Sequence, residues 1–213
     1  MTRNKTIAKF HFITINHPEI SHANQAIRAY QAGCKWVQLR MKDSSEEEIE
    51  QEIIKILPVA NTHNAILLIN DNVELTLKVG AHGVHLGKKD MCPAEARKLL
   101  GSNFIIGGTA NTYEDILSLI EKGVDYVGLG PFRFTTTKRK LSPTLGRVGY
   151  DQILTGLKSN QLNIPVIAIG GILENDIESL KQTGIHGIAV GGAIVAGNAI
   201  ERNIQNYQQL IHS

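Results

Sequence analysis

Three polar residues alternate with apolar ones along a short segment near the start of the chain. Gln38, Arg40 and Lys42 are separated by Leu39 and Met41. Successive side chains of a strand point to opposite faces, so this period of two places the three polar groups on one side. A buried arginine or lysine needs a partner of opposite charge, and a bound anion supplies one. The pattern predicts an anion site at the end of a strand, with internal ion pairs as the alternative.

Two aspartates follow the next two apolar segments. Asn70 and Asp71 end the first segment, and Asp90 lies three residues after Gly87. Neighbouring strands lie about 4.8 Å apart, so both carboxylates can reach one point above the strand ends. Mg²⁺ is typically held by one or two carboxylates with phosphate oxygens and water. The pair, beside two cations, indicates a site for Mg²⁺ and pyrophosphate, although aspartates also cap turns. His85, within the second segment, is expected to pack inside the fold rather than to catalyse.

Hydroxyl groups and a further cation follow the central segments. The hydroxyl and amide groups that follow the fifth segment, at Thr109 and Asn111, can bind a phosphate or a ring nitrogen. The alternative is that they only cap the next helix, with Asn111 or Thr112 as the N-cap. The basic loop 132–148 has the length of a functional lid, with a solvated loop as the alternative. Its residues suited to phosphate contact are Thr135, Thr137 and Lys138. Lys138 is expected to follow charge as it develops on a leaving group.

Paired glycines end the last two apolar segments, at Gly170-Gly171 and Gly191-Gly192. Such pairs expose backbone N–H groups that can hold a phosphate, and they are also common in tight turns. The chain therefore carries two expected anion sites, one cationic and metal-assisted and one made of neutral backbone. That combination suits an enzyme that joins a diphosphate-activated molecule to a monophosphate.

The elements that must position these residues alternate along the whole chain. Strands are predicted at 9–15, 36–40, 66–70, 83–87, 104–108, 126–130, 165–170 and 187–191. Helices are predicted at 22–32, 45–60, 73–79, 93–100, 113–122, 149–158, 174–183 and 199–211. Strict alternation implies parallel strands with right-handed crossovers. Each strand, helix and pair of loops needs roughly 24 residues, so eight units nearly fill the 213 residues.

The predicted fold is a single-domain (β/α)8 TIM barrel over residues 1–213. An open doubly wound sheet would favour a Gly-x-Gly-x-x-Gly turn after the first strand, but Asn16-His17-Pro18-Glu19 follows it. A glycine also precedes every second strand, at Gly33, Gly80, Gly123 and Gly184, as a helix-ending residue would. This spacing resembles a two-unit repeat wrapped into a ring.

Composition limits the other function classes. The formal net charge is +2 and aromatic residues are 5%, which argues against nucleic acid as a partner. No segment approaches the ~20 apolar residues of a membrane span, and the first residues lack the apolar core of a signal peptide. Two isolated cysteines, Cys34 and Cys92, fit a reduced cytoplasmic setting. Small phosphorylated molecules are the expected partners.

Taken together, the motifs resemble those of the thiamine-phosphate synthase family, also called thiamine-phosphate pyrophosphorylases. They are Val37-Gln-Leu-Arg-Met-Lys42, Ile69-Asn-Asp71, Gly83-Val-His-Leu-Gly-Lys-Lys-Asp90, Asp125-Tyr-Val-Gly-Leu-Gly-Pro131, Thr135-Thr-Thr-Lys138 and Pro165-Val-Ile-Ala-Ile-Gly-Gly-Ile172. The resemblance implies that 4-amino-5-hydroxymethyl-2-methylpyrimidine diphosphate is joined to 4-methyl-5-(2-phosphoethyl)thiazole, with release of pyrophosphate. It also implies a dissociative reaction, in which pyrophosphate leaves before the thiazole nitrogen attacks, and it is compatible with a homodimer.

The resemblance further implies roles for individual residues. Mg²⁺ would be bound by Asp71 and Asp90. The pyrimidine diphosphate would be held by Gln38, Arg40, Lys42, Asn70, Thr109 and Lys138. The thiazole phosphate would be held by Thr135, Thr137, Gly171, Gly191 and Gly192. Stabilisation of the leaving group, and thus catalysis, would fall to Arg40, Asn70 and Lys138.

Two positions depart from the family pattern. The family usually has serine at the end of the fifth strand, where Thr109 stands, and often has a serine at the end of the eighth, where Gly191-Gly192 stands. The second departure removes a phosphate-binding hydroxyl and leaves the backbone N–H groups. Two alternatives stay open. A related thiazole tautomerase tends to lack the full diphosphate and metal set, which is complete here, and a non-catalytic sensor of a phosphorylated precursor would not need the aspartate pair.

Overall fold

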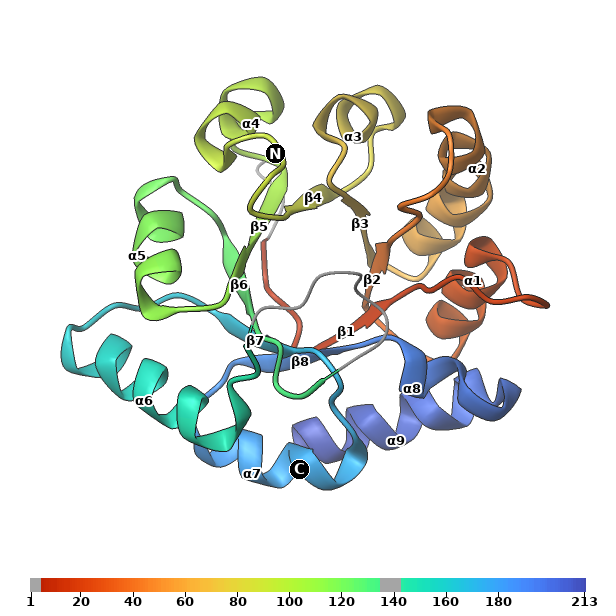
Figure 1. Ribbon diagram of the computed structural model, residues 1–213. Coiled ribbons are helices and arrows are strands. Elements are labelled where there is room, and N and C mark those ends of the chain that lie inside the picture. Colours follow the sequence, from red (N-terminus) through yellow and green to blue (C-terminus); the bar gives the residue numbers. More distant parts are fainter. Residues whose placement is uncertain (1–4, 135–142) are drawn as a thin grey trace.

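Eight parallel strands close into a barrel surrounded by helices in a computed structural model that describes residues 5–134 and 143–213 (Figure 1). Each strand pairs with the next in sequence, and β1 closes the ring by pairing with β8. Phe12 of β1 faces Val37 of β2 on one side and Val190 of β8 on the other. The predicted (β/α)8 barrel is therefore confirmed.

The strands are short and lie close to their predicted positions. They are β1 Phe10–Ile13, β2 Trp36–Leu39, β3 Ile66–Asn70, β4 Gly83–Leu86, β5 Ile105–Ala110, β6 Tyr126–Leu129, β7 Val166–Ile169 and β8 Gly187–Val190. Only β5 extends clearly beyond its predicted end, by two residues, because Thr109 and Ala110 still pair with Gly128 and Leu129 of β6. Thr109 thus belongs to β5, and its side chain points to the inside of the barrel.

The outer ring contains one helical segment after each strand. Its members are α1 His22–Gln31, α2 Glu46–Thr62, α3 Val73–Val79, α4 Pro93–Leu100, α5 Tyr113–Glu121, α6 Gly146–Ser159, the 3₁₀ turn η1 Glu174–Asp176 with α7 Ile177–Gln182, and α8 Gly192–Val195 with η2 Ala196–Asn198 and α9 Ile200–His212. The short α8 directly after β8 was not predicted. An extra helix in this place recurs in barrels that bind phosphate.

Local signals in the sequence account for several helix ends. Ser45 accepts a hydrogen bond from the Glu48 backbone, and the Glu48 side chain accepts one from the Ser45 backbone, which forms the predicted capping box. Thr112, rather than Asn111, caps α5. The four recurring glycines all have positive φ, between 67° and 90°, as their helix-ending role requires.

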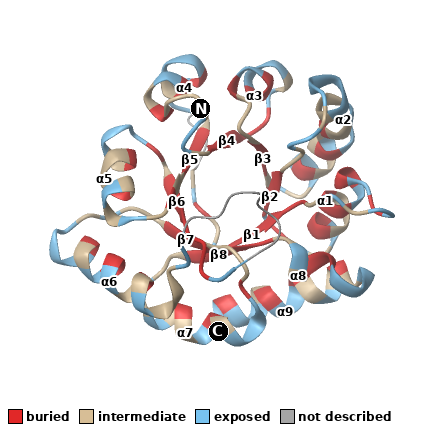
Figure 2. Cartoon of the chain, in the orientation of Figure 1, coloured by how far each residue is buried: buried red, intermediate tan, exposed pale blue. Residues whose placement is uncertain are grey.

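The core has two layers, which follow the alternation of side chains along the strands. Outward-facing residues pack against the helices. Inward-facing residues fill the barrel with a separate cluster: Ile7, Ile13, Trp36, Leu68, Ile105, Tyr126, Ile167 and Ala189. Figure 2 shows burial concentrated on the strands and on the inner faces of the helices. No helix of the described residues has the length and apolarity to cross a membrane.

Candidate active site

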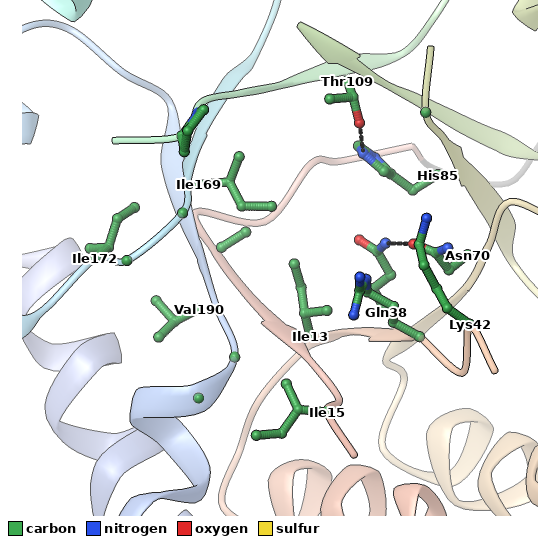
Figure 3. A pocket seen from close by; sticks show the side chains of 18 of the residues that line it. Ile13, Ile15, Gln38, Lys42, Asn70, His85, Thr109, Ile169, Ile172 and Val190 are labelled. Carbon is green, nitrogen blue, oxygen red and sulfur yellow. Dashed lines mark hydrogen bonds between the residues drawn. The ribbon is translucent and has the colours of Figure 1, made fainter. Parts of the chain in front are cut away.

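A cavity of about 420 Å³ opens at the carboxyl ends of the strands, in the size range of small-molecule sites. Its walls are made by the last inward-facing residues of the strands and by the loops that follow them (Figure 3). The predicted residues that line it are Gln38, Arg40, Lys42, Asn70, Asp71, Thr109, Gly171, Gly191 and Gly192. The active sites of such barrels lie at this face.

Gln38 and Asn70 form a hydrogen-bonded amide pair on neighbouring strands. Gln38 Nε2 donates to Asn70 Oδ1 over 2.7 Å, and the Gln38 side chain is buried. This bond fixes the orientation of the Gln38 amide, so its oxygen points into the cavity (Figure 3). The pair offers a hydrogen-bond acceptor at a fixed place in the wall.

Arg40 follows β2 and remains half-buried at the rim rather than turning into solvent. Its backbone N–H donates to the Thr14 hydroxyl over 3.1 Å, which ties the end of β2 to β1. Burial lowers the pKa of the Arg40 guanidinium, and the negative charges of Asp71 and Asp43 oppose that shift. The group stays cationic because its ordinary pKa is far above neutrality.

Asp71 and Asp90 meet beside Lys42. Lys42 Nζ lies 3.1 Å from Asp71 Oδ2, while Asp90 Oδ2 accepts a hydrogen bond of 2.6 Å from the Gly87 backbone. Burial raises the pKa of Asp71 to about 6, helped by a hydrogen bond to Asp90 and by its charge and opposed by Lys42. Two carboxyl groups this close resist ionising together, and a bound cation relieves that repulsion.

Asp71 also has an unusual backbone conformation. Its φ is +67°, in the left-handed region that non-glycine residues seldom occupy but that aspartate tolerates better than most. Its backbone N–H donates to the carbonyl of His85 over 2.9 Å, which holds it across to β4. The turn is thereby shaped so that the carboxylate lies near Asp90. Strand order predicted that the two carboxylates would lie close together, as they do, although Asp90 lines a neighbouring hollow rather than this cavity. Their role as metal ligands stays a prediction.

The donor set at these aspartates fits a hard divalent cation. No group of three or more His, Cys, Asp or Glu side chains suited to a metal occurs in residues 5–134 and 143–213. Two carboxylates are nevertheless the usual protein contribution to Mg²⁺ when phosphate oxygens and water supply the remaining ligands.

The glycine turn after β7 forms the opposite wall. Gly170 and Gly171 have φ values of +97° and +69°, and a Cβ on Gly171 would lie 2.5 Å from Cγ of Arg133. Arg133 makes a two-pronged ion pair with Asp176, with both N–O distances 2.8 Å, and donates to the Gly171 carbonyl over 3.2 Å. Arg133 is not among the residues that line the cavity, but it supports the turn through these bonds.

The turn after β8 is more open. Gly191 and Gly192 both line the cavity, and a Cβ on Gly192 would meet no atom within 4 Å. The backbone N–H groups at the start of α8 therefore lie next to unfilled space. A larger residue at position 192 fits sterically, unlike one at Gly171.

Apolar side chains lie between the polar wall and the glycine turns. The labelled members are Ile13, Ile15, Ile169, Ile172 and Val190 (Figure 3). Sequence reasoning did not identify them, because isoleucine and valine near strand ends are typical core residues. The available signal was their place at the ends of β1, β7 and β8. They give the cavity a surface suited to the face of an aromatic ring. Thr135, Thr137 and Lys138 lie outside the described residues.

A closed parallel barrel with cationic side chains, paired carboxylates and glycine turns at its mouth is typical of an enzyme that acts on small molecules. Residues 10–194 match the family model for thiamine monophosphate synthase. The chain belongs to this family.

Individual relatives agree with that placement. Thiamine-phosphate synthase from Bacteroides thetaiotaomicron is 47% identical over 203 residues, which covers 94% of this chain and 97% of the relative. The enzyme of the same name from Bacteroides fragilis is 50% identical over 184 residues, covering 86% and 90% of the two chains. A solved thiamine phosphate pyrophosphorylase from Pyrococcus furiosus superposes with a TM-score of 0.84 at 26% identity, over 96% of this chain and 95% of the other.

Proposed function

We propose that the protein joins 4-amino-5-hydroxymethyl-2-methylpyrimidine diphosphate to 4-methyl-5-(2-phosphoethyl)thiazole, giving thiamine phosphate and pyrophosphate. The observation that carries the proposal is the division of one cavity into two anion-binding walls. The Arg40, Lys42 and Asp71 side chains make one wall, with Asp90 behind it in contact with Asp71, and the glycine turns after β7 and β8 make the other. Family membership supports the same reaction.

The diphosphate is assigned to the cationic wall. Arg40 and Lys42 provide hydrogen-bond donors with positive charge, and charge-assisted hydrogen bonds are the strong ones. Asn70 is fixed through its bond to Gln38 and joins the same wall. Lys138 remains a predicted contact to the same diphosphate. These groups would oppose the negative charge that grows on the departing pyrophosphate.

Asp71 and Asp90 would hold Mg²⁺, which supplies charge neutralisation at the diphosphate when bound. In its absence the ammonium of Lys42 partly neutralises Asp71. Lys42 also lines the cavity, where its ammonium group would contact the diphosphate. The two aspartates therefore act through charge and position, without accepting a proton from the substrate.

The thiazole phosphate is assigned to the glycine wall, with Gly171, Gly191 and Gly192 offering backbone N–H groups. Thr135 and Thr137 remain predicted contacts. The apolar residues between the walls would hold the two rings close together, so that the thiazole nitrogen faces the methylene carbon of the pyrimidine. Holding two reactants in this way lowers the barrier without any covalent protein intermediate.

In the reaction, the bond between the methylene carbon and the diphosphate oxygen breaks first, and its electron pair leaves with pyrophosphate. The electron pair of the thiazole nitrogen then forms the new bond to carbon. Electrons and atoms balance without a protein nucleophile. Arg40, Asn70 and Lys138 are the proposed catalytic residues, because they would touch the departing group.

The direct test mixes purified protein, Mg²⁺ and both substrates, and measures thiamine phosphate and pyrophosphate in equal amounts. Formation of both supports the proposal. Isomerisation of a thiazole carboxylate phosphate without pyrophosphate release would identify a tautomerase, and binding of the phosphates without any turnover would identify a sensor. The cytoplasmic location and the homodimer remain predictions.

A further inference from the structure

A chain of three hydrogen-bonded side chains runs from inside the barrel to the floor of the cavity. Tyr126 Oη lies 2.8 Å from His85 Nδ1, and His85 Nε2 lies 2.9 Å from Thr109 Oγ1. Tyr126 and His85 are buried, whereas Thr109 is partly exposed at the cavity (Figure 3). The three residues come from β6, β4 and β5, so the chain crosses neighbouring strands.

Two glycines make room for this chain. A Cβ on Gly107 would lie 2.3 Å from the Tyr126 ring, and a Cβ on Gly128 would lie 3.0 Å from Cε1 of His85. Both glycines are in inward-facing positions, where other barrel residues carry bulky side chains. The rings of Trp36 and His11 meet the Tyr126 ring edge-on, at centroid distances of 5.7 and 5.3 Å. The phenol is therefore fixed on several sides.

The donors and acceptors along this chain can be assigned. Burial raises the pKa of Tyr126 well above its ordinary value, so its hydroxyl keeps its proton. Among the described residues, the partner of that hydroxyl is His85 Nδ1. A buried hydroxyl that donates to nothing is costly, so the phenol donates and Nδ1 accepts. A neutral imidazole with an accepting Nδ1 carries its proton on Nε2. Nε2 therefore donates to Thr109 Oγ1.

We infer that His85, held by Tyr126, is a positioning residue that turns the Thr109 hydroxyl into a hydrogen-bond donor facing the cavity. Because Oγ1 already accepts from His85, the threonine proton is directed toward the ligand. Gln38 presents an amide oxygen to the same cavity, so an uncharged acceptor is available there as well as the uncharged donor of Thr109. An aminopyrimidine edge, which has an accepting ring nitrogen beside a donating amino group, matches such a pair. This step rests on the proposed function.

The first test examines the histidine directly and needs no substrate. Long-range ¹H–¹⁵N spectra of the wild-type protein should show the Nε2–H tautomer of His85. Tyr126→Phe removes the phenolic donor and should shift that signal toward a mixture of tautomers. Tyr30→Phe removes another buried hydroxyl, which bonds to the Ile66 carbonyl, and should leave the signal unchanged. A wild-type His85 protonated on Nδ1 would overturn the inference.

The second test uses kinetics. Thr109→Val should raise KM for the pyrimidine diphosphate by roughly tenfold or more, while KM for the thiazole phosphate stays near its wild-type value. Tyr126→Phe should produce a smaller rise of the same kind, and no further rise when added to Thr109→Val. Two effects that multiply fully in the double variant would contradict the relay, because additive sites do not act through each other.

A conservative replacement separates positioning from packing. His85→Gln can place an amide N–H where Nε2 lies, and should restore most of the affinity that His85→Leu loses. Equal losses in both variants would assign His85 a packing role and overturn the inference. Failure of the proposed function would be distinguishable, since the wild-type protein would then form no thiamine phosphate while the tautomer measurement would still apply.

Discussion

Lys42 Nζ lies 3.1 Å from Asp71 Oδ2, and this ion pair occupies the rim between the ends of β2 and β3. Lys42 partly offsets the unfavourable proximity of Asp71 and Asp90, since it opposes the rise in the Asp71 pKa that burial and Asp90 cause. One ammonium group therefore faces two carboxyl groups, and the negative charge that it leaves unbalanced can attract a cation. Several expected outcomes depend on it.

Removing either carboxylate charge should greatly reduce turnover. We expect Asp71→Asn and Asp90→Asn each to lower kcat/KM by roughly 10²–10³, the usual loss when one group that stabilises developing charge is removed. Steady-state assays at saturating Mg²⁺ measure the effect, and circular dichroism controls for folding. Wild-type rates in both variants would mean that the aspartates only shape turns.

Mg²⁺ affinity should depend on pH through Asp71. Its folded-state pKa of about 6 lies above the ordinary value of 3.8, so in the metal-free protein it contributes stability that is fully present below pH 3.8 and is lost as the pH rises through about 6. Cation binding requires the ionised form. Apparent Mg²⁺ affinity should fall by up to about tenfold per pH unit below about 6. Titrations of Mg²⁺ activation from about pH 5 to 8 measure this, and a flat profile would contradict it.

The two glycine turns should respond differently to substitution. Gly171→Ala should raise KM for the thiazole phosphate and lower Tm, because position 171 has φ +69° and no room beside Arg133. Gly192→Ser should fold normally and lower KM for the thiazole phosphate severalfold, since there is space for the hydroxyl at the turn proposed to bind this phosphate. Gly192→Glu should instead weaken binding through repulsion of the phosphate. An unchanged KM in both position-192 variants would place this phosphate elsewhere.

The ion pair between Arg133 and Asp176 should affect folding stability and KM more than kcat. Asp176→Asn is expected to cost about 1 kcal/mol of folding free energy or less, because the arginine is partly exposed. It should also raise KM for the thiazole phosphate a few-fold with kcat preserved, as the Gly170-Gly171 turn loses one support. Thermal unfolding and a KM measurement test both parts. Asp151→Asn, which alters an ion pair between two exposed side chains, Arg147 and Asp151, is the matched control and should change neither.

The sequence contained enough to predict the barrel. Alternating segments of suitable length predict the strand order, and that order alone places Asp71 near Asp90. The exact end of β5 was missed because Gly107 and Gly108 weaken a strand pattern, yet here their missing side chains admit Tyr126 and Leu119. The four-residue helix α8 was missed because it is too short to show a helical period.

Within the site, residue type predicted the charged wall and the glycine turns but not the rest. Ile13, Ile169 and Ile172 have the composition of core residues, and only the closed ring reveals that they face a cavity. His85 was expected to pack inside the barrel, and it does, but the partners of its two ring nitrogens depend on neighbouring strands. Contacts between β4, β5 and β6 are tertiary information that spacing along the chain does not contain.

The two-layered core has a consequence for how this chain tolerates change in length. Every strand sends alternate side chains to the barrel interior and to the helices, so losing one residue from within a strand would exchange its two layers. In β2, such a deletion would send Gln38 toward the helices and bring an aliphatic side chain to the mouth of the barrel. Loops at the opposite, amino-terminal end of the strands carry no such constraint, and variation in their length should leave the chemistry intact.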